Sequence, residues 1–378
     1  MQAPAMRQLK SLTLKKVGEN GLIVDKVIPF VTPMRLGIIL EKISTKVNET
    51  IKEIRGPRLG APENAIEGFL KKNKIERSEL QEKKTDKGYF YFYTVKVNAQ
   101  SLSKILSRIF TEIIQEFNWP KSMYWGDNYS LRWVRPLRSI IAVLFQNEAR
   151  ERVPVIVRDI DSDIVTRAHH VMHPEFFEFY SIDDYRERML KGKVILQPMD
   201  RKERIVQEGK KQAEARGFYL VEDDKLLDEI AGLTEFPVPI LGEIPKELLL
   251  IPEEVIITSM REHQKFLSLR SSASGKVEGF LVIADLQTHD KQKTILSGNM
   301  RVLNSRLRDA MFFYQNDLNL VKEHGMSAWN DKLKSVRFHE KLGSQYDRVE
   351  RIVKVATLLA RKFDLEEDRV RKAATFIK

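Results

Sequence analysis

The sequence predicts a multidomain protein of the α+β class, and three observations carry that prediction. The chain has 378 residues, of which 42% are hydrophobic, enough for two to four domains with cores of their own. Runs of strand-forming residues and amphipathic helical patterns are mixed through most of the chain. From residue 331 onward, only the helical pattern remains.

The first predicted domain, residues 1–150, mixes both kinds of element. A loop rich in Gly and Pro, residues 56–62, precedes a short helix. The aromatic run from Tyr89 to Tyr93 is typical of a strand, and the segment after Ser101 has apolar residues at helical spacing. The expected strands are 21–30, 37–40 and 89–97, and the expected helices are 64–72 and 101–117.

Three further parts follow along the chain. The boundaries expected are 151–235 for a second α+β domain, 236–330 for a third α+β unit, and 331–378 for the beginning of a helical domain. The second part is predicted to contain strands at 153–157 and 193–196 and a charged helix at 201–216. The third is predicted to contain a helix from Glu253, a hairpin around 271–275, a strand at 279–284 and a long helix from Gly298.

Composition excludes several classes of protein. There is no Cys, which excludes disulfides, thiolate zinc sites and Cys nucleophiles. No run of about 18 apolar residues indicates a membrane span. Lys and Arg number 64 against 53 Asp and Glu, a net charge of +11 that favours an anionic partner, with nucleic acid first.

One arginine cluster follows a tryptophan-rich segment. Arg132, Arg135 and Arg138 surround Pro136, which suits the first position of a helix continued by the apolar residues 140–144. Cations at a helix N-terminus oppose its dipole, and a bound anion would remove that conflict. A structural ion-pair cluster packed on the tryptophans and a contact with a partner subunit are the alternatives.

Two later segments carry further candidates. In the helix from Glu253, Arg261 and Lys265 lie one turn apart with His263 between them, and His263 is a candidate acid–base group or a packing residue. In the helix from Gly298, Arg301, Ser305 and Arg308 form one stripe, which is either solvated or grips phosphate or another domain.

The remaining motifs give no complete catalytic site. His169, His170 and His173 form the only histidine cluster, but Pro174 interrupts any helix and no Cys is present, so no metal site is expected. No Walker A loop, Rossmann glycine fingerprint or nucleophile elbow occurs in the sequence.

The order and spacing of several segments resemble those of the β subunit family of bacterial heterotetrameric glycyl-tRNA synthetase. The resemblance covers nearly the whole chain. The segments are Thr32 to Leu36, Trp119 to Gly126, Arg132 to Pro136, Pro252 to Val255, Met260 to Gln264, Gly298 to Tyr314, and Glu340 to Glu350.

The chain also departs from that family's pattern. It has Ala168-His169-His170-Val171 where the family tends to have Gly-His-Arg-Phe. We expect it to start just inside the family's first strand. The family continues past Lys378, so we expect a truncated N-terminal portion.

The resemblance implies a cytoplasmic subunit of a heterotetrameric ligase. In that family the α subunit binds ATP, Mg²⁺ and glycine, while the β subunit holds tRNA and is required for charging, so no cofactor is expected on this chain. The third unit resembles the editing-domain fold of the phenylalanyl enzyme's β subunit, and the C-terminal helices resemble the start of an HD-type domain. The residues expected to contact tRNA or the α subunit are Arg132, Arg135, Arg138, Arg261, Lys265, Arg301 and Arg308.

Two other functions stay open from the sequence. The first is a hydrolase that edits mischarged tRNA through His263, or that acts through an HD-type metal site. The second is a scaffold that binds the α subunit and never contacts RNA.

Overall fold

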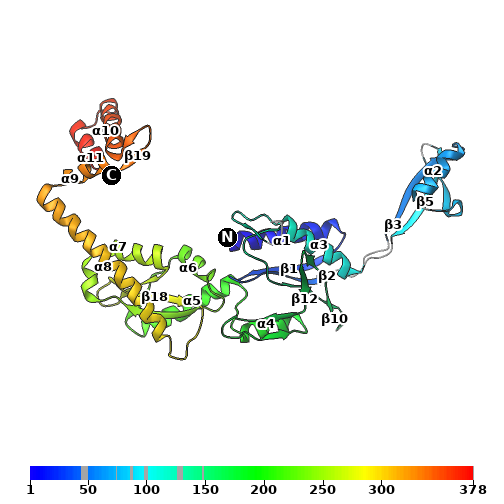
Figure 1. Cartoon of the computed structure of the whole chain (residues 1–378), viewed down its shortest axis with the longest axis horizontal. Helices are drawn as coiled ribbons and strands as arrows, with labels where there is room; N and C mark the ends of the chain where they lie inside the picture. The colour runs from blue at the N-terminus through cyan, green and yellow to red at the C-terminus, as the bar shows by residue number, and fades with distance from the viewer. Residues whose placement is uncertain are drawn as a thin grey trace. The chain divides into compact units, whose positions relative to one another are not determined.

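The computed structural model describes residues 1–43, 50–73, 75–85, 88–97, 101–125, 131–146 and 149–377 (Figure 1). Helices and strands are mixed through the chain, which confirms the α+β class. The chain forms two compact units, while the four-part division into domains stays a prediction. The N-terminal unit contains Met1–Ile205, Leu227–Val238 and Ala284–Gln287, and the C-terminal unit contains Val206–Leu226, Pro239–Ile283 and Thr288–Lys378.

Two helices and a hairpin make the core of the N-terminal unit. The helices are α1 (Gln2–Glu19) and α3 (Leu102–Glu116), and the hairpin joins β1 (Val24–Val31) to β2 (Leu36–Ile43) in antiparallel register. The apolar stripe of α3 is buried among residues from α1 and the strands, as the helical spacing predicts. Lys16 on α1 donates to the carboxylates of Glu112 and Glu116 on α3, both at 2.8 Å, which fixes the two helices side by side.

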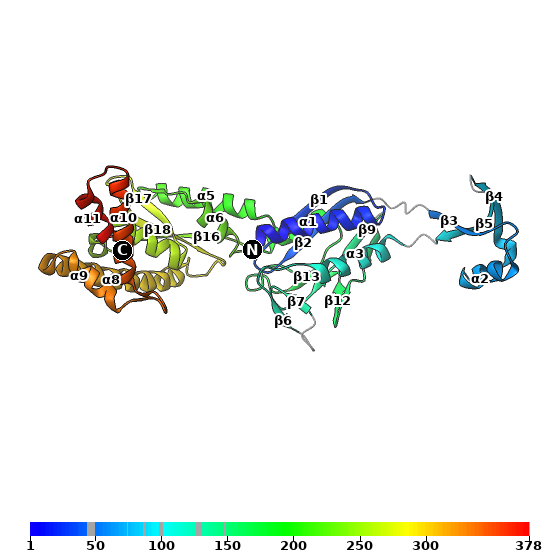
Figure 2. The same ribbon diagram turned by 90° about the horizontal axis from the view of Figure 1, so that it is seen from above.

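Residues 50–97 form a small module of their own (Figures 1 and 2). Its three strands pair in the order β3-β5-β4, all antiparallel. The predicted helix and the predicted aromatic strand are both confirmed here. The elements are β3 (Thr50–Arg58), α2 (Glu63–Asn73), the 3₁₀ turn η1 (Arg77–Glu79), β4 (Leu80–Thr85) and β5 (Gly88–Val97).

The helix predicted to begin at Pro136 is wrong. Residues 134–139 are not helical, and the apolar residues after them form short strands. Ile140 and Ile141 pair in parallel with β12, and the next strand, β9, pairs with β10, because sheet partners outweigh the local pattern. The strands are β6 (Met123–Trp125), β7 (Leu131–Trp133), β8 (Ile140–Ile141), β9 (Val143–Gln146), β10 (Ala149–Arg152), β11 (Ile156–Val157), β12 (Ile160–Asp163), β13 (Val165–Arg167) and β14 (Phe176–Glu178).

Two helices follow these strands, α4 (Ile182–Lys191) and α5 (Pro198–Glu214). The helix predicted over 201–216 is therefore confirmed. The strand predicted at 193–196 is wrong, since this segment is a loop. Its carbonyls at Ile195 and Leu196 accept hydrogen bonds from the Arg201 guanidinium rather than from a neighbouring strand.

The C-terminal unit is built around a four-stranded sheet in the order β15-β17-β18-β16. The predicted hairpin and its second strand are confirmed as β17 and β18, which pair antiparallel. The elements are β15 (Phe218–Leu220), α6 (Asp224–Ala231), β16 (Val238–Glu243), the 3₁₀ helix η3 (Lys246–Leu250), α7 (Glu253–Thr258), the π-helix η4 (Ser259–Gln264), β17 (Leu267–Ser271) and β18 (Val277–Ala284).

A long helix, α8 (Lys293–His324), packs against η3 and η4 through its buried Leu303 and Leu307. The chain after it is mainly helical, as predicted, but it also contains a two-stranded hairpin that the sequence did not indicate. The assignment to an HD-type domain stays a prediction. These elements are α9 (Ser327–Lys332), η5 (Leu333–Ser335), β19 (Arg337–His339), β20 (Gly343–Ser344), α10 (Gln345–Lys362) and α11 (Glu367–Thr375). Within the described ranges, none of the helices has the length and apolar character needed to cross a membrane.

Candidate functional site

The arginine cluster of the N-terminal unit projects from a strand and a loop rather than from a helix. Arg132 lies in β7, where its Nε donates to the Ser122 hydroxyl at 2.6 Å. Arg135 and Arg138 follow in the loop and are exposed. Among the described residues, neither Arg135 nor Arg138 forms an ion pair with a carboxylate. The helix-dipole argument for an anion here is therefore wrong, but three solvated cations remain close together in sequence.

An aromatic cluster anchors this segment. Phe117, Trp119 and Trp133 pack with ring centroids 4.7 to 5.3 Å apart. Trp119 is 7% exposed and belongs to the core that α1 and α3 form. Trp119 thus packs inside and Trp133 is partly buried, while the arginines stay outside. The tryptophan packing of the structural alternative is found, but its ion-pair cluster is not found among the described residues.

The second candidate segment ends in a π-helix, which corrects the expected single α-helix. The α-helix α7 ends at Thr258, and η4 widens the turn so that Met260 is fully buried. Lys265 then closes the turn with φ of 57°, in the left-handed region. Arg261 and Lys265 therefore do not lie one α-helical turn apart.

The charges on this segment are exposed to different degrees. Arg261 forms an ion pair with Asp223, with Nε 3.0 Å from Oδ2, and keeps 43% of its side chain exposed, while His263 is exposed. Single-turn π-helices are frequent at functional sites. Here the exposed side chains of the turn are Glu262 and His263, and Arg261 pairs with the carboxylates of Asp223 and Glu262.

The third candidate stripe lies on α8, which packs against η3 and η4. Arg301 is exposed, and Arg308 lies 3.7 Å from Glu247 of η3 with 65% of its side chain exposed. The four cations predicted for this unit therefore come from neighbouring elements. Arg261 and Lys265 belong to one sequence motif and Arg301 and Arg308 to another, and the fold puts both motifs in the C-terminal unit.

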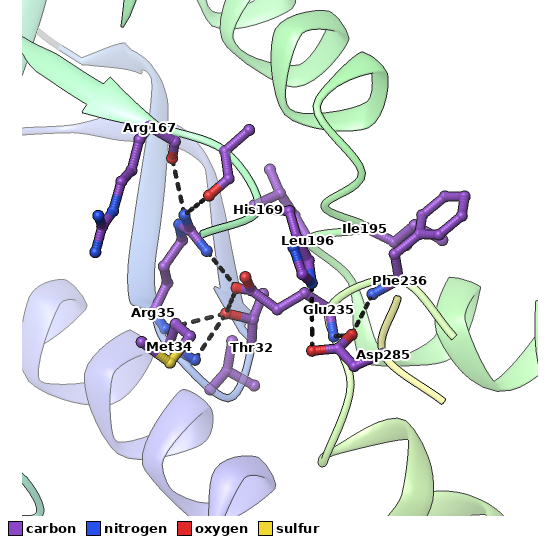
Figure 3. A network of polar contacts seen from close by, with 12 residues as sticks. Thr32, Met34, Arg35, Arg167, His169, Ile195, Leu196, Glu235, Phe236 and Asp285 are labelled. Carbon is purple, nitrogen blue, oxygen red and sulfur yellow. Dashed lines mark hydrogen bonds and ion pairs between the residues drawn. The ribbon is translucent and has the colours of Figure 1, made fainter. Parts of the chain in front are cut away.

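The sequence did not predict a buried polar network in the N-terminal unit (Figure 3). At its centre, Glu235 is 1% exposed and accepts hydrogen bonds from the Thr32 hydroxyl, at 2.6 Å, and from the Arg35 guanidinium. Arg35 also donates to the carbonyls of Arg167 and Ala168 at 2.8 and 2.6 Å. One arginine thus joins the β1–β2 turn to two distant segments.

A histidine–carboxylate pair lies beside this network. The Nδ1 atom of His169 accepts from the backbone N–H groups of Val171 and Met172, at 3.3 and 3.2 Å. In the neutral ring, Nε2 therefore carries the proton, and it faces Asp285 Oδ2 at 3.5 Å. Because His169 is fully buried, a substrate cannot reach its ring, and the pair has a structural role.

Arg201 is the most deeply buried charge of the unit, with no exposed surface. Its guanidinium donates to the carbonyls of Val31, Ile195, Leu196 and Ala231, at 2.6 to 3.1 Å. Burial lowers its pKa to about 10, against the nearby carboxylates that favour its charged form. Its bonds hold three separate segments together.

Comparison with known proteins places this architecture in one family. The family model described as "Glycyl-tRNA synthetase beta subunit" matches residues 1–378, the whole chain. The chain belongs to the glycyl-tRNA synthetase β subunit family.

Individual members of the family agree with this assignment. The chain is 40% identical over 378 residues to the glycine–tRNA ligase β subunit of Paracoccus denitrificans, covering all of this chain and 55% of that protein. It is 39% identical over 378 residues to that of Dinoroseobacter shibae, covering 52% of it. With the Rickettsia bellii protein it shares 35% identity over 340 residues, 90% of this chain and 50% of that one. The chain thus spans about half the length of the curated relatives it matches.

Several segments that carry the family resemblance stabilise this fold. Thr32 and Arg35 of the first segment hold Glu235. Ser344 and Asp347 of the last segment form a capping box at the start of α10. These parts of the family pattern therefore stabilise the fold.

Proposed function

We propose that this chain works in a glycine–tRNA ligase as its β subunit, docking on a catalytic α subunit and helping to place tRNA for the ATP-dependent attachment of glycine. The family match over the whole chain is the observation that carries the proposal. The aminoacylation site, ATP and Mg²⁺ then belong to the α subunit, and this chain binds no cofactor. Such a complex works in the cytoplasm.

Charge supports the part of the proposal that concerns tRNA. The chain carries +11 overall, and tRNA is a polyanion whose backbone phosphates release counterions when cations replace them. The candidate contacts are exposed or half-exposed in both units. They are Arg132, Arg135, Arg138, Arg261, Lys265, Arg301 and Arg308.

Docking is tested first by light scattering coupled to size exclusion, with the chain alone and with the α subunit from the same source. A joint peak is expected. Separate peaks together with no gain in glycine charging by the α subunit would overturn the proposal.

The arginine cluster is tested by charge reversal. The triple variant Arg132→Glu, Arg135→Glu, Arg138→Glu is compared with Lys10→Glu, Lys15→Glu, Lys191→Glu, which changes the charge equally at exposed sites of the same unit. If the three arginines contact phosphates, the triple variant has a shallower plot of the logarithm of the tRNA association constant against the logarithm of the salt concentration. The magnitude of its slope is smaller by roughly two to three. An equal fall in both variants would mean that only the net charge acts.

The alternatives give different results. An editing enzyme would release glycine or another amino acid from charged tRNA, and His263→Ala would abolish that release. A scaffold would give the joint peak while tRNA retention at about 50 mM salt stays absent.

A further inference from the structure

The module of residues 50–97 has two unlike faces. Directly opposed residues of antiparallel strands share a face, and neighbours along a strand alternate. Tyr91 and Tyr93 of β5 therefore lie on one face, and Phe90 and Phe92 lie on the other.

The tyrosine face is partly covered by the helix of the module. α2 packs against β3, where a Cβ placed at Gly56 would lie 3.0 Å from the Phe69 ring. Arg77, which follows α2, hydrogen-bonds the Tyr91 side chain, and Ile66 of α2 is 3% exposed. α2 thus covers part of this face, although Tyr89 near the start of β5 is 51% exposed.

The phenylalanine face lies opposite the contacts of α2. Phe90 and Phe92 are half-buried, as Tyr91 and Tyr93 are, but the contact of α2 with the sheet, at Gly56 of β3, is on the tyrosine face. The Arg55 guanidinium lies 3.6 Å from the Phe90 ring centroid, and the Lys83 ammonium lies 6.0 Å from that of Phe92. Arg58, paired with Phe90 in the sheet, is exposed.

The phenylalanine face therefore combines planar groups with positive charge. Arg55, Arg58 and Lys83 lie on this face, and the register also places Glu53, opposite Thr94, on it; the module's sequence has 11 Lys and Arg against 7 Asp and Glu, a net charge of +4. Aromatic rings on an open sheet stack unpaired bases, and guanidinium planes do the same while attracting phosphate. A duplex hides its bases inside the stack and cannot use such rings.

We propose that the face formed by Arg55, Arg58, Lys83, Phe90 and Phe92 binds unpaired nucleotides of RNA by base stacking. The inference rests on the proposed role in placing tRNA and names a surface for it. That surface is separate from the arginines selected from the sequence.

The rings are tested with the double variant Phe90→Leu, Phe92→Leu in the whole chain, because leucine keeps apolar volume but cannot stack. Binding is measured by fluorescence anisotropy of labelled oligouridylate and of a short RNA duplex. Each lost ring weakens single-strand binding by about tenfold, and the duplex affinity stays unchanged. The tyrosine variant Phe90→Tyr, Phe92→Tyr restores binding. Circular dichroism confirms that each variant is folded.

The cations have a matched control on the same module. Arg55→Gln with Arg58→Gln removes two charges from the phenylalanine face, and Lys71→Gln with Lys72→Gln removes two exposed charges from α2. The first pair weakens oligouridylate binding severalfold more than the second. Equal effects of the two pairs, or leucine variants that bind like the wild type, would overturn the inference.

Failure of this inference is distinguishable from failure of the proposed function. If the wild-type chain supports charging by the α subunit and the leucine variant does so equally with unchanged oligouridylate affinity, only the stacking surface is wrong. If the leucine variant instead loses the joint peak with the α subunit, the face is a protein interface and the RNA assignment is overturned. If the wild type retains oligouridylate but neither tRNA nor charging, the proposed function fails while the stacking surface stands.

Discussion

Arg201 offers the sharpest test of how the N-terminal unit is held together. The variant Arg201→Met keeps most of the side-chain volume and removes the guanidinium. Four carbonyls, those of Val31, Ile195, Leu196 and Ala231, then lose a donor at once; the bonds to Val31 and Ala231 are buried and the other two are partly buried. Because a buried acceptor without a partner costs free energy, we expect strong destabilisation.

Two opposing effects set how much the free energy of unfolding changes in Arg201→Met. Hydrogen bonds from a charged donor contribute about 1.5 kcal/mol each at the lower end of their range, or about 6 kcal/mol for the set. Burial of the charge acts in the other direction, because the lowered pKa of about 10 corresponds to about 3 kcal/mol that the variant regains. The loss of the hydrogen bonds is the larger effect, and the net loss in free energy of unfolding is about 3 kcal/mol.

The assay is urea unfolding followed by circular dichroism and tryptophan fluorescence. Lys191→Met is the control, because it removes one exposed ion pair with Glu187, worth less than about 1 kcal/mol. Arg201→Lys keeps the charge but not the planar fork, and we expect it to lose most of the same stability. If Arg201→Met were as stable as Lys191→Met, the reasoning from unsatisfied carbonyls would be refuted.

Three further predictions concern local features. Hydrogen bonds from Thr288 and Thr294 hold the pKa of Asp290 well below its usual range. The carboxylate therefore stabilises the start of α8 above about pH 4, and this stabilisation is lost as the pH falls through the folded-state pKa. The difference in urea midpoint between the wild type and Asp290→Asn should therefore shrink on acidification, and a constant difference would contradict this. Gly37→Ala should cost about 2 kcal/mol in urea unfolding, because its Cβ would lie 2.2 Å from the Phe30 ring, whereas Gly18→Ala, with open space around it, should be neutral or stabilising. Ser101→Ala should lower the thermal midpoint by removing the cap that accepts the Lys104 N–H, a loss of about 1 kcal/mol, and an unchanged midpoint would show that the cap contributes nothing.

Elements with a strong local pattern could be predicted from the sequence. The stripe of α3 and the aromatic run of β5 need no distant partner to be recognised, because their period is set by the backbone geometry of a helix and of a strand. The same holds for the basic charge and for the segments that resemble the family.

Elements whose hydrogen bonds come from far along the chain could not be predicted. The residues after Pro136 have an apolar pattern that fits a helix, yet β8 finds its partner in β12. The segment 193–196 has strand-forming residues, yet Arg201 supplies its donors.

The candidate site divides in the same way. The sequence by itself determined which cations are available, since arginine and lysine side chains that stay in water are charged at neutral pH. Only the tertiary structure decided that Arg35 meets Glu235, 200 residues away, and that Arg201 is buried. It also decided that Phe90 and Phe92 lie on one face of a sheet and Tyr91 on the other, where α2 packs. The physical reason is that burial and pairing depend on what packs against a residue, which its neighbours in sequence do not specify.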